Sequence, residues 1–204
     1  MMKLVARDIE KKFNRRRVLT RINFELEGAA SLVITGINGA GKTTLIKILS
    51  GLLSPTSGEV SYYLDNTAIP REQVYRHIGL VGPYLQLYRD LTAWENLAFF
   101  AKARTGGVDR QRILALLERF GLKGRQMDPL KSYSSGMLQR VKYVMALYDQ
   151  PRVLFLDEPT SNLDEAGKQL VYEVVQAQKR DHIVIIATNE PEEIRLAEKR
   201  VDVA

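Results

Sequence analysis

A glycine-rich loop constrains this chain more than any other feature of its sequence. Residues 36–44, Gly-Ile-Asn-Gly-Ala-Gly-Lys-Thr-Thr, fit the pattern G-x-x-x-x-G-K-[ST] of loops that bind nucleotide phosphates. An apolar run over 31–35 precedes the loop, and a helical pattern of Leu and Ile follows it. Because the pattern needs a strand before it and a helix after it, this setting supports a phosphate-binding loop.

Each residue type in this loop has a physical role in holding phosphate. The glycines let the backbone turn tightly and aim its N–H groups at phosphate oxygens, and the helix start adds partial positive charge. Lys42 can reach the β- and γ-phosphates, and the hydroxyl of Thr43 can bind Mg²⁺. The residues predicted to contact the nucleotide are Gly36, Asn38, Gly39, Ala40, Gly41, Lys42, Thr43 and Thr44.

The bulk composition fits a folded chain with a real core. It has 204 residues, 45% hydrophobic and 26% charged, which suits one large domain or a core with a small subdomain. It has no cysteine, which excludes disulfides and thiolate metal sites and favours a reducing compartment. No apolar stretch approaches the roughly 18 residues of a membrane span. Charge appears too early for a signal peptide, so the chain is not expected to cross a membrane itself.

Much of the positive charge lies near the N-terminus. The chain carries a net charge of +6, and its basic residues crowd positions 11–21: Lys11, Lys12, Arg15, Arg16, Arg17 and Arg21. A basic patch can bind nucleic acid or anionic lipid headgroups. Since no aromatic ladder accompanies the cluster, a solvated turn between two strands is the preferred interpretation.

Hydrophobic patterns along the chain predict an α/β fold. Apolar strands alternate with helices, which indicates a mostly parallel sheet flanked by helices. The predicted strands are 3–9, 18–26, 31–35, 59–64, 152–156 and 182–187, and a helix is predicted at about 165–180.

The middle of the chain is predicted to be helical. Thr92 and Glu95 form a capping-box pattern, a second amphipathic helix covers 113–120, and a third begins near Ser135. This block lies between segments of β character. We therefore expect one domain over 1–204, in which a helical subdomain at about 93–147 interrupts a β subdomain and nucleotide-binding core at about 1–92 and 148–204.

A pair of carboxylates is the second chemical feature. Asp157 and Glu158 end the apolar strand, where open α/β sheets place their ligands. Asp157 can hold Mg²⁺ through its water shell, and Glu158 can act as general base for an attacking water. The alternative interpretation is an ordinary charged turn after a core strand. The phosphate loop makes this alternative less favoured, because such a loop needs an acidic residue to hold its metal.

Taken together, these motifs resemble the ATP-binding cassette (ABC) ATPases over nearly all of the chain. Residues 36–44 match the Walker A motif, and 153–160 match Walker B with its catalytic glutamate. Residues 161–164 match the D-loop, 133–140 resemble the signature LSGGQ-x-Q-R, and Phe13 stands where the family places its adenine-stacking aromatic. The resemblance implies a P-loop NTPase fold with an N-terminal antiparallel β subdomain, and an ATPase that uses ATP and Mg²⁺.

The signature segment gives the resemblance a consequence for assembly. Ser134, Ser135 and Gly136 would lie at a helix N-terminus with free N–H groups, although Ser135 and Met137 replace the family's Gly and Gln. In this family the surface binds the γ-phosphate held by a second subunit, so the resemblance implies a dimer on ATP binding. It also places Asp164 of the D-loop at the nucleotide. A simple N-cap is the alternative interpretation of the signature serines.

Two further departures concern turnover. Asn189 stands where the family has a switch histidine, and Pro83 stands where it has a glutamine that monitors the metal. Asn can hydrogen-bond a γ-phosphate but cannot take a proton at neutral pH. The predicted catalytic residues are therefore Glu158, Lys42 and Asn189, and slow or tightly coupled turnover is expected.

A transporter subunit is the expected context. The resemblance implies a separate transmembrane permease docked near residues 82–96, which would place the chain on the cytoplasmic face of the membrane. The alternative is an ABC-type ATPase that acts on DNA or ribosomes. This alternative ranks well below transport, because the chain has one Walker A motif and no sustained heptads between Walker A and Walker B. Among transporters, it resembles haem exporters of cytochrome c biogenesis, with multidrug- and polysaccharide-type exporters also close.

Overall fold

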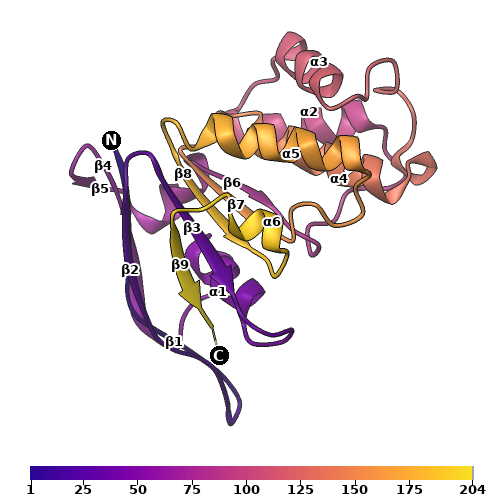
Figure 1. Cartoon of the computed structure of the whole chain (residues 1–204). Coiled ribbons are helices and arrows are strands. Elements are labelled where there is room, and N and C mark those ends of the chain that lie inside the picture. The colour runs from indigo at the N-terminus through magenta and orange to yellow at the C-terminus, as the bar shows by residue number, and fades with distance from the viewer. Residues whose placement is uncertain (204) are drawn as a thin grey trace.

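The computed structural model describes residues 1–203 and contains two β-sheets (Figure 1). One sheet is antiparallel, and its strands pair in the order β2-β1-β4-β5. These strands are β1 (Met2–Phe13), β2 (Arg16–Glu27), β4 (Ser57–Leu64) and β5 (Thr67–Ala68).

The basic cluster lies on the β1–β2 hairpin and not in a long turn. Only Asn14 and Arg15 lie outside the two strands, and Asn14 takes a left-handed φ of 53° at the tip. The strands run beyond the predicted 3–9 and 18–26 because their antiparallel ladder continues as far as the pair Phe13 and Arg16. The basic side chains are mostly exposed on this hairpin, as solvated charges should be.

The second sheet is parallel throughout and forms the centre of the molecule. Its strand order is β6-β7-β8-β3-β9, and every residue of β3, β7 and β8 is buried. Continuous apolar runs of this kind are typical of strands covered on both faces. The strands are β3 (Ala30–Thr35), β6 (Ile78–Val81), β7 (Val153–Asp157), β8 (Ile183–Ala187) and β9 (Lys199–Asp202).

Helices cover both faces of the parallel sheet (Figure 1). Helices α2, α3 and α4 lie within the stretch at about 93–147 that was expected to be helical, and Thr92 and Glu95 form the expected capping box of α2. The helices are α1 (Lys42–Leu49), α2 (Ala93–Thr105), α3 (Arg110–Arg119), α4 (Ser135–Leu147), α5 (Glu165–Gln178) and α6 (Pro191–Ile194), with 3₁₀ turns η1 (Arg71–Arg76) and η2 (Leu130–Ser132).

The parallel sheet separates two hydrophobic cores. Successive side chains of a strand point to opposite faces, so Phe155 packs with α1 and the antiparallel sheet, whereas Leu154 and Leu156 pack with the helices α2 to α5. The sheet is thereby fixed between two layers, and the loops at its carboxyl edge start from rigid positions. None of the helices within residues 1–203 combines the length and apolar character that crossing a bilayer requires.

Candidate functional site

Three neighbouring strands of the parallel sheet deliver the predicted motifs to one edge. Strands β7, β8 and β3 are adjacent and parallel, so their carboxyl ends meet. The phosphate loop follows β3 at Thr35, Asp157 ends β7, and Asn189 follows β8 after Thr188. Sequence positions more than 100 residues apart therefore converge at the place where open α/β sheets bind ligands.

The phosphate loop depends on glycine at defined positions. Gly36, Gly39 and Gly41 have φ of 148°, 83° and 116°, which side chains rarely allow. A Cβ atom at Gly36 would lie 2.2 Å from the carbonyl oxygen of Val203, so the chain after β9 runs directly against the loop. Both the backbone conformation and the space exclude other residues at Gly36.

The N-terminus of α1 is arranged to receive an anion. Gly41 is its N-cap and offers no side-chain hydrogen bond, and no acidic residue lies in the first turn. The first amides of the helix are therefore open to a ligand, with the helix dipole favouring negative charge. Lys42 is only 8% exposed and donates to the carbonyl oxygen of Gly36 at 2.6 Å. Within residues 1–203 no carboxylate forms an ion pair with it, so this buried ammonium suits a phosphate partner.

Asp157 provides a carboxylate with an unused oxygen. The residue is 1% exposed, and its Oδ2 atom is buried without a hydrogen-bond partner. Burial raises the pKa of Asp157, while the Thr43 hydroxyl and the charge of Lys42 act in the opposite direction. Thr43 and Asp157 offer the oxygen donors that Mg²⁺ prefers. At protein sites Mg²⁺ usually combines one or two carboxylates with phosphate oxygens and water.

Glu158 has a strained backbone. Its φ is 50°, in the left-handed region that few residues other than glycine adopt, and its N–H donates to the carbonyl oxygen of Ala187 at 2.9 Å. Its side chain is exposed and lines a polar cavity of about 470 Å³ together with Lys42 and Asn189. Strain of this kind persists where the surrounding structure imposes it, and such positions are concentrated at active sites.

Asn189 contacts the phosphate loop directly. Its amide Nδ2 donates to Oδ1 of Asn38 at 3.2 Å, which joins the segment after β8 to the segment after β3. Both side chains line the polar cavity beside Lys42 and Glu158. One chain thus brings together the predicted phosphate loop, Asp157, Glu158 and Asn189.

The signature serines lie at a different place. Ser134 is the N-cap of α4, and its hydroxyl accepts a hydrogen bond from the N–H of Met137 at 3.2 Å. Ser134 and Ser135 are exposed, and a Cβ atom at Gly136 would lie 2.8 Å from the carbonyl oxygen of Asn162. None of these three residues lines the cavity that contains Lys42 and Glu158. Their contact with nucleotide stays a prediction.

Two other predicted nucleotide contacts have different surroundings. Asp164 caps α5, since it accepts the N–H of Gly167 at 3.0 Å, and it also accepts from Arg140 at 2.6 Å. The Gly167 N–H and then Arg140 hold the pKa of Asp164 low, so the side chain already has partners within the chain. Phe13 is 47% exposed near the hairpin tip, with Nζ of Lys11 5.0 Å from its ring centroid. One face of its ring can therefore still stack on a base.

Glu193 is a buried residue of the site that the sequence interpretation missed. It is 1% exposed on α6, and its Oε1 accepts from the N–H of Thr160 at 3.2 Å and from the hydroxyl of the same residue at 2.5 Å. Burial raises its pKa, against the hydrogen bonds of Thr160 and Thr188. It thus links the segment after Glu158 to the segment before Asn189. Pro191 could have indicated a helix here, but nothing in the sequence indicated burial.

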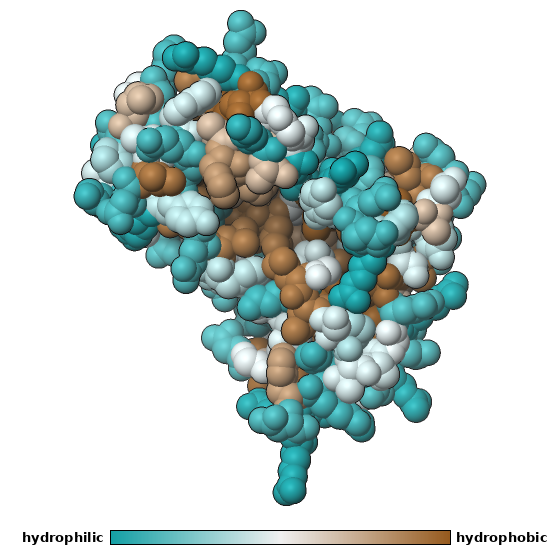
Figure 2. Space-filling model, turned by 180° about the vertical axis from the view of Figure 1, so that it is seen from behind, coloured by the Kyte–Doolittle hydropathy of each residue, from teal (hydrophilic) through white to brown (hydrophobic). Residues whose placement is uncertain are grey.

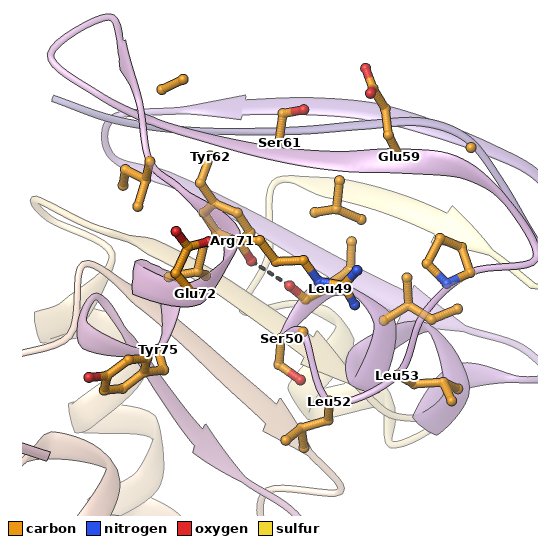
Figure 3. Close-up of a pocket in the computed structure, with 18 of the residues that line it drawn as sticks. Leu49, Ser50, Leu52, Leu53, Glu59, Ser61, Tyr62, Arg71, Glu72 and Tyr75 are labelled. Carbon is orange, nitrogen blue, oxygen red and sulfur yellow. Dashed lines mark hydrogen bonds between the residues drawn. The ribbon is translucent and has the colours of Figure 1, made fainter.

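A second cavity is separate from this site. About 500 Å³ in volume, it lies between the end of α1, strand β4 and η1, and none of the predicted site residues lines it (Figure 3). The phenol of Tyr62 crosses it and donates to the carbonyl oxygen of Leu49 at 2.6 Å. That bond holds the C-terminus of α1 against the antiparallel sheet, so Tyr62 supports the far end of the helix that carries Lys42.

Comparison with known protein sequences identifies the family of this chain. A family model described as "ABC transporter" matches residues 19–161. The lantibiotic transport ATP-binding protein SrtF of Streptococcus pyogenes is 32% identical, over 91% of this chain and 79% of that protein. The linearmycin resistance ATP-binding protein LnrL of Bacillus subtilis (strain 168) is 32% identical, over 91% of this chain and 60% of that protein.

Solved structures agree with the fold. An ATP-binding subunit of an ABC transporter is 26% identical with a TM-score of 0.86, covering 98% of this chain and 85% of that one. The cassette MJ0796, solved as a dimer bound to ADP and Pi, is 24% identical with a TM-score of 0.85, over 98% and 94%. The predicted P-loop fold is thereby confirmed. The chain belongs to the ABC transporter family, as an ATP-binding cassette ATPase.

Proposed function

We propose that this ATPase is the motor subunit of an exporter-type membrane transporter, acting as a pair of cassettes with Mg²⁺ as its metal. The observation that carries the proposal is the convergence at one sheet edge of an open helix N-terminus, a buried lysine and two carboxylates. These are the parts that phosphoryl transfer needs, since it depends on positioning and on charge stabilisation.

The residues divide the chemistry among them. Lys42 and the first amides of α1 bind the phosphates of ATP. Thr43 and Asp157 hold Mg²⁺, which when bound neutralises charge on the phosphate oxygens. Glu158 accepts a proton from the water that attacks the γ-phosphate. Asn189, oriented by Asn38, donates a hydrogen bond to the same phosphate.

A second copy completes the site. The Ser134–Gly136 surface is exposed and does not line the cavity that contains Lys42, so it is free to meet a nucleotide bound by another copy. Two head-to-tail copies would place the α4 N-terminus of one against the γ-phosphate bound by the other. The dimeric state of the related MJ0796 cassette supports this arrangement.

A separate apolar groove suits the permease. It has a volume of about 240 Å³ and lies where the end of α1 and strand β6 meet α2 and α4, which belong to the helical subdomain. Figure 2 shows an apolar hollow between the two lobes of the molecule. Residues of the predicted docking segment line the groove. A membrane partner bound there would hold the chain on the cytoplasmic face of the membrane. The groove is lined by Leu52, Tyr75, Leu80, Leu85, Leu87 and Phe100, among others.

The groove can be tested at its exposed rim. Leu52 is 59% exposed, so Leu52→Glu should leave the fold and ATP binding unchanged while it prevents co-purification with a membrane protein. Met127→Glu alters an equally exposed hydrophobic residue, 65% exposed, that does not line the groove. Capture of a membrane protein by Leu52→Glu as well as by the control would contradict this docking site.

Cargo is proposed from the relatives alone. Their names refer to lantibiotic transport, linearmycin resistance and daunorubicin resistance, so we propose an antibiotic-like cargo. None of these names refers to haem, so the haem expectation gains no support and stays a prediction. The alternative of action on DNA or ribosomes likewise has no relative among them.

The role of Glu158 is tested by Glu158→Gln. The variant should bind ATP normally, remain dimeric with ATP, and hydrolyse it about 100-fold more slowly or worse, in line with the loss of a general base. Glu192→Gln is the matched control, since Glu192 lines the same cavity but accepts a hydrogen bond from Tyr172 at 3.0 Å. Wild-type turnover by Glu158→Gln would remove Glu158 as the base.

A further inference from the structure

Two buried polar atoms near the phosphate loop have no hydrogen-bond partner. One is Oδ2 of Asp157, and the other is the hydroxyl oxygen of Tyr84. Leaving such a group unpaired in a protein interior is unfavourable, so each of these atoms calls for a partner. Two such atoms on neighbouring segments are what a shared polar ligand would satisfy.

Strand pairing places Tyr84 next to the carboxylate. Strands β6 and β7 are parallel neighbours, and Val81 pairs with Leu156 one residue before Asp157. The chain then runs through Gly82 and Pro83 to Tyr84, whose ring packs on Gly82. A Cβ atom at Gly82 would lie 2.9 Å from Cζ of Tyr84, so a side chain at position 82 would displace this ring.

Helix α1 closes the other side of the ring. Nζ of Lys47 lies 4.2 Å from the ring centroid of Tyr84, and Lys47 is one helical turn beyond Thr43. The ring is therefore held between Gly82 and Lys47, which fixes the position of its hydroxyl. Segments α1, β6 and β7 thus converge on Thr43, Asp157 and Tyr84.

The phenol is a hydrogen-bond donor at neutral pH. Burial, and then the negative charge of Asp157, hold the pKa of Tyr84 well above its ordinary value. A protonated phenol can donate to a water molecule and can also accept a hydrogen bond from it. Gly82 and Pro83 have no side-chain donor or acceptor, so Tyr84 is the first residue after β6 with a polar side chain.

We propose that the Tyr84 hydroxyl hydrogen-bonds the water shell of the Mg²⁺ ion held by Thr43 and Asp157. Mg²⁺ keeps several of its waters when it binds to proteins, and one such water can satisfy both unpaired oxygens. The inference rests on the proposed metal role of Thr43 and Asp157. It makes Tyr84 a positioning residue for the metal, acting through water.

The test is Tyr84→Phe, which removes the hydroxyl and keeps the ring over Lys47. Binding of a fluorescent ATP analogue in EDTA should be unchanged. The Mg²⁺ concentration that half-saturates the metal-dependent increase in binding should rise about tenfold, the lower range for losing a hydrogen-bond partner of a metal site. Electron paramagnetic resonance of Mn²⁺ with the analogue should show the same shift. Tyr88→Phe is the control, because Tyr88 is 60% exposed a few residues along the same segment.

Asp157→Asn separates this inference from the proposed function. If Asp157→Asn keeps normal Mg²⁺ dependence, the metal site itself is wrong. If Asp157→Asn loses that dependence while Tyr84→Phe keeps it, only the role of Tyr84 is wrong. Thermal unfolding in EDTA should show Tyr84→Phe at least as stable as the wild type, because the variant lacks the unpaired hydroxyl. A defect in folding would lower the thermal stability and weaken the binding of the ATP analogue in EDTA. The proposal instead requires that only the Mg²⁺ dependence of binding shifts.

Discussion

The N-termini of helices α1 and α4 are both built from small residues, but they differ in what satisfies their amides. At α1 the N-cap is Gly41, which offers no side-chain hydrogen bond, and the buried Lys42 follows at once. At α4 the N-cap is Ser134, whose hydroxyl accepts from Met137. The first helix end is open and the second is already capped.

The difference indicates that the two helix ends contribute to ligand binding in different ways. An open end with its own lysine and two nearby carboxylates can hold a charged nucleotide within one chain. A capped and exposed end contributes its remaining amides and hydroxyls only when a ligand is brought to it. We therefore expect changes at α1 to abolish binding, and changes at α4 to affect only what happens after binding.

Removing the lysine of the open end should give the largest effect. Lys42→Ala deletes a buried charge-assisted donor worth about 3 kcal/mol, which corresponds to about 100-fold weaker ATP binding. Turnover should fall at least as far. Equilibrium binding of a fluorescent ATP analogue and a phosphate-release assay measure the two losses.

The control for this variant is Lys123→Ala. Lys123 is an exposed lysine that pairs with Glu118 in the helical subdomain, and its loss changes the net charge equally. Binding by Lys42→Ala that stays within a few-fold of the control would mean that α1 is not the binding end, and the comparison would fail.

A charge at the capped end should separate stability from assembly. Ser135→Glu adds a carboxylate to the first turn of α4, which should raise the free energy of unfolding by about 0.3–1 kcal/mol through the helix dipole. The same charge would face the γ-phosphate bound by a second copy. We expect normal ATP binding, but at least about tenfold weaker ATP-dependent dimerisation, from repulsion worth 1.4 kcal/mol or more. Light scattering after size-exclusion chromatography, in a Glu158→Gln background, measures dimerisation.

Gln111→Glu provides the matched control. Gln111 is exposed in the first turn of α3, which is capped by Asp109, so the same charge is added to another helix N-terminus. Equal dimerisation by Ser135→Glu and this control would show that the α4 end does not meet the nucleotide of a second copy.

The fold could be predicted from the sequence where a strand is a continuous apolar run. The apolar runs of β3, β7 and β8 are buried on both faces and were recognisable as such. Strands β6 and β9 were missed, because Ile78–Val81 is only four residues long and Lys199–Asp202 is mostly charged. These two segments become strands because β7 and β3 offer them open edges, which is a property of the assembled sheet.

The candidate site also contains residues that the sequence predicted and residues that it did not. The phosphate loop, Asp157 and Glu158 were predictable because their residue types and spacing follow from the chemistry of phosphate binding. Tyr84 and Glu193 were not, since their importance comes from burial and unpaired oxygens that arise only after packing. Sequence patterns thus identify groups that touch a ligand more readily than groups that orient them.

The smallest effect is expected from Asn189→His, on the open side of the comparison. Asn189 donates to Asn38 of the phosphate loop but cannot exchange a proton. A histidine there can, so basal ATP hydrolysis should rise about threefold to tenfold. This is below the 10²–10⁴-fold of a full general acid or base, because Glu158 is proposed to accept the proton. Turnover should also gain a dependence on a group with a pKa near 6.5, measured as a pH–rate profile.

Asn189→Gln decides whether the gain comes from proton chemistry. It keeps an amide and lacks a titrating group, so its rate should stay at or below the wild-type rate and its pH profile should be unchanged. An equal gain from Asn189→Gln would assign the effect to altered packing against Asn38. An unchanged rate in Asn189→His would mean that Asn189 does not limit turnover, and the expectation of slow turnover would then rest on Pro83 alone.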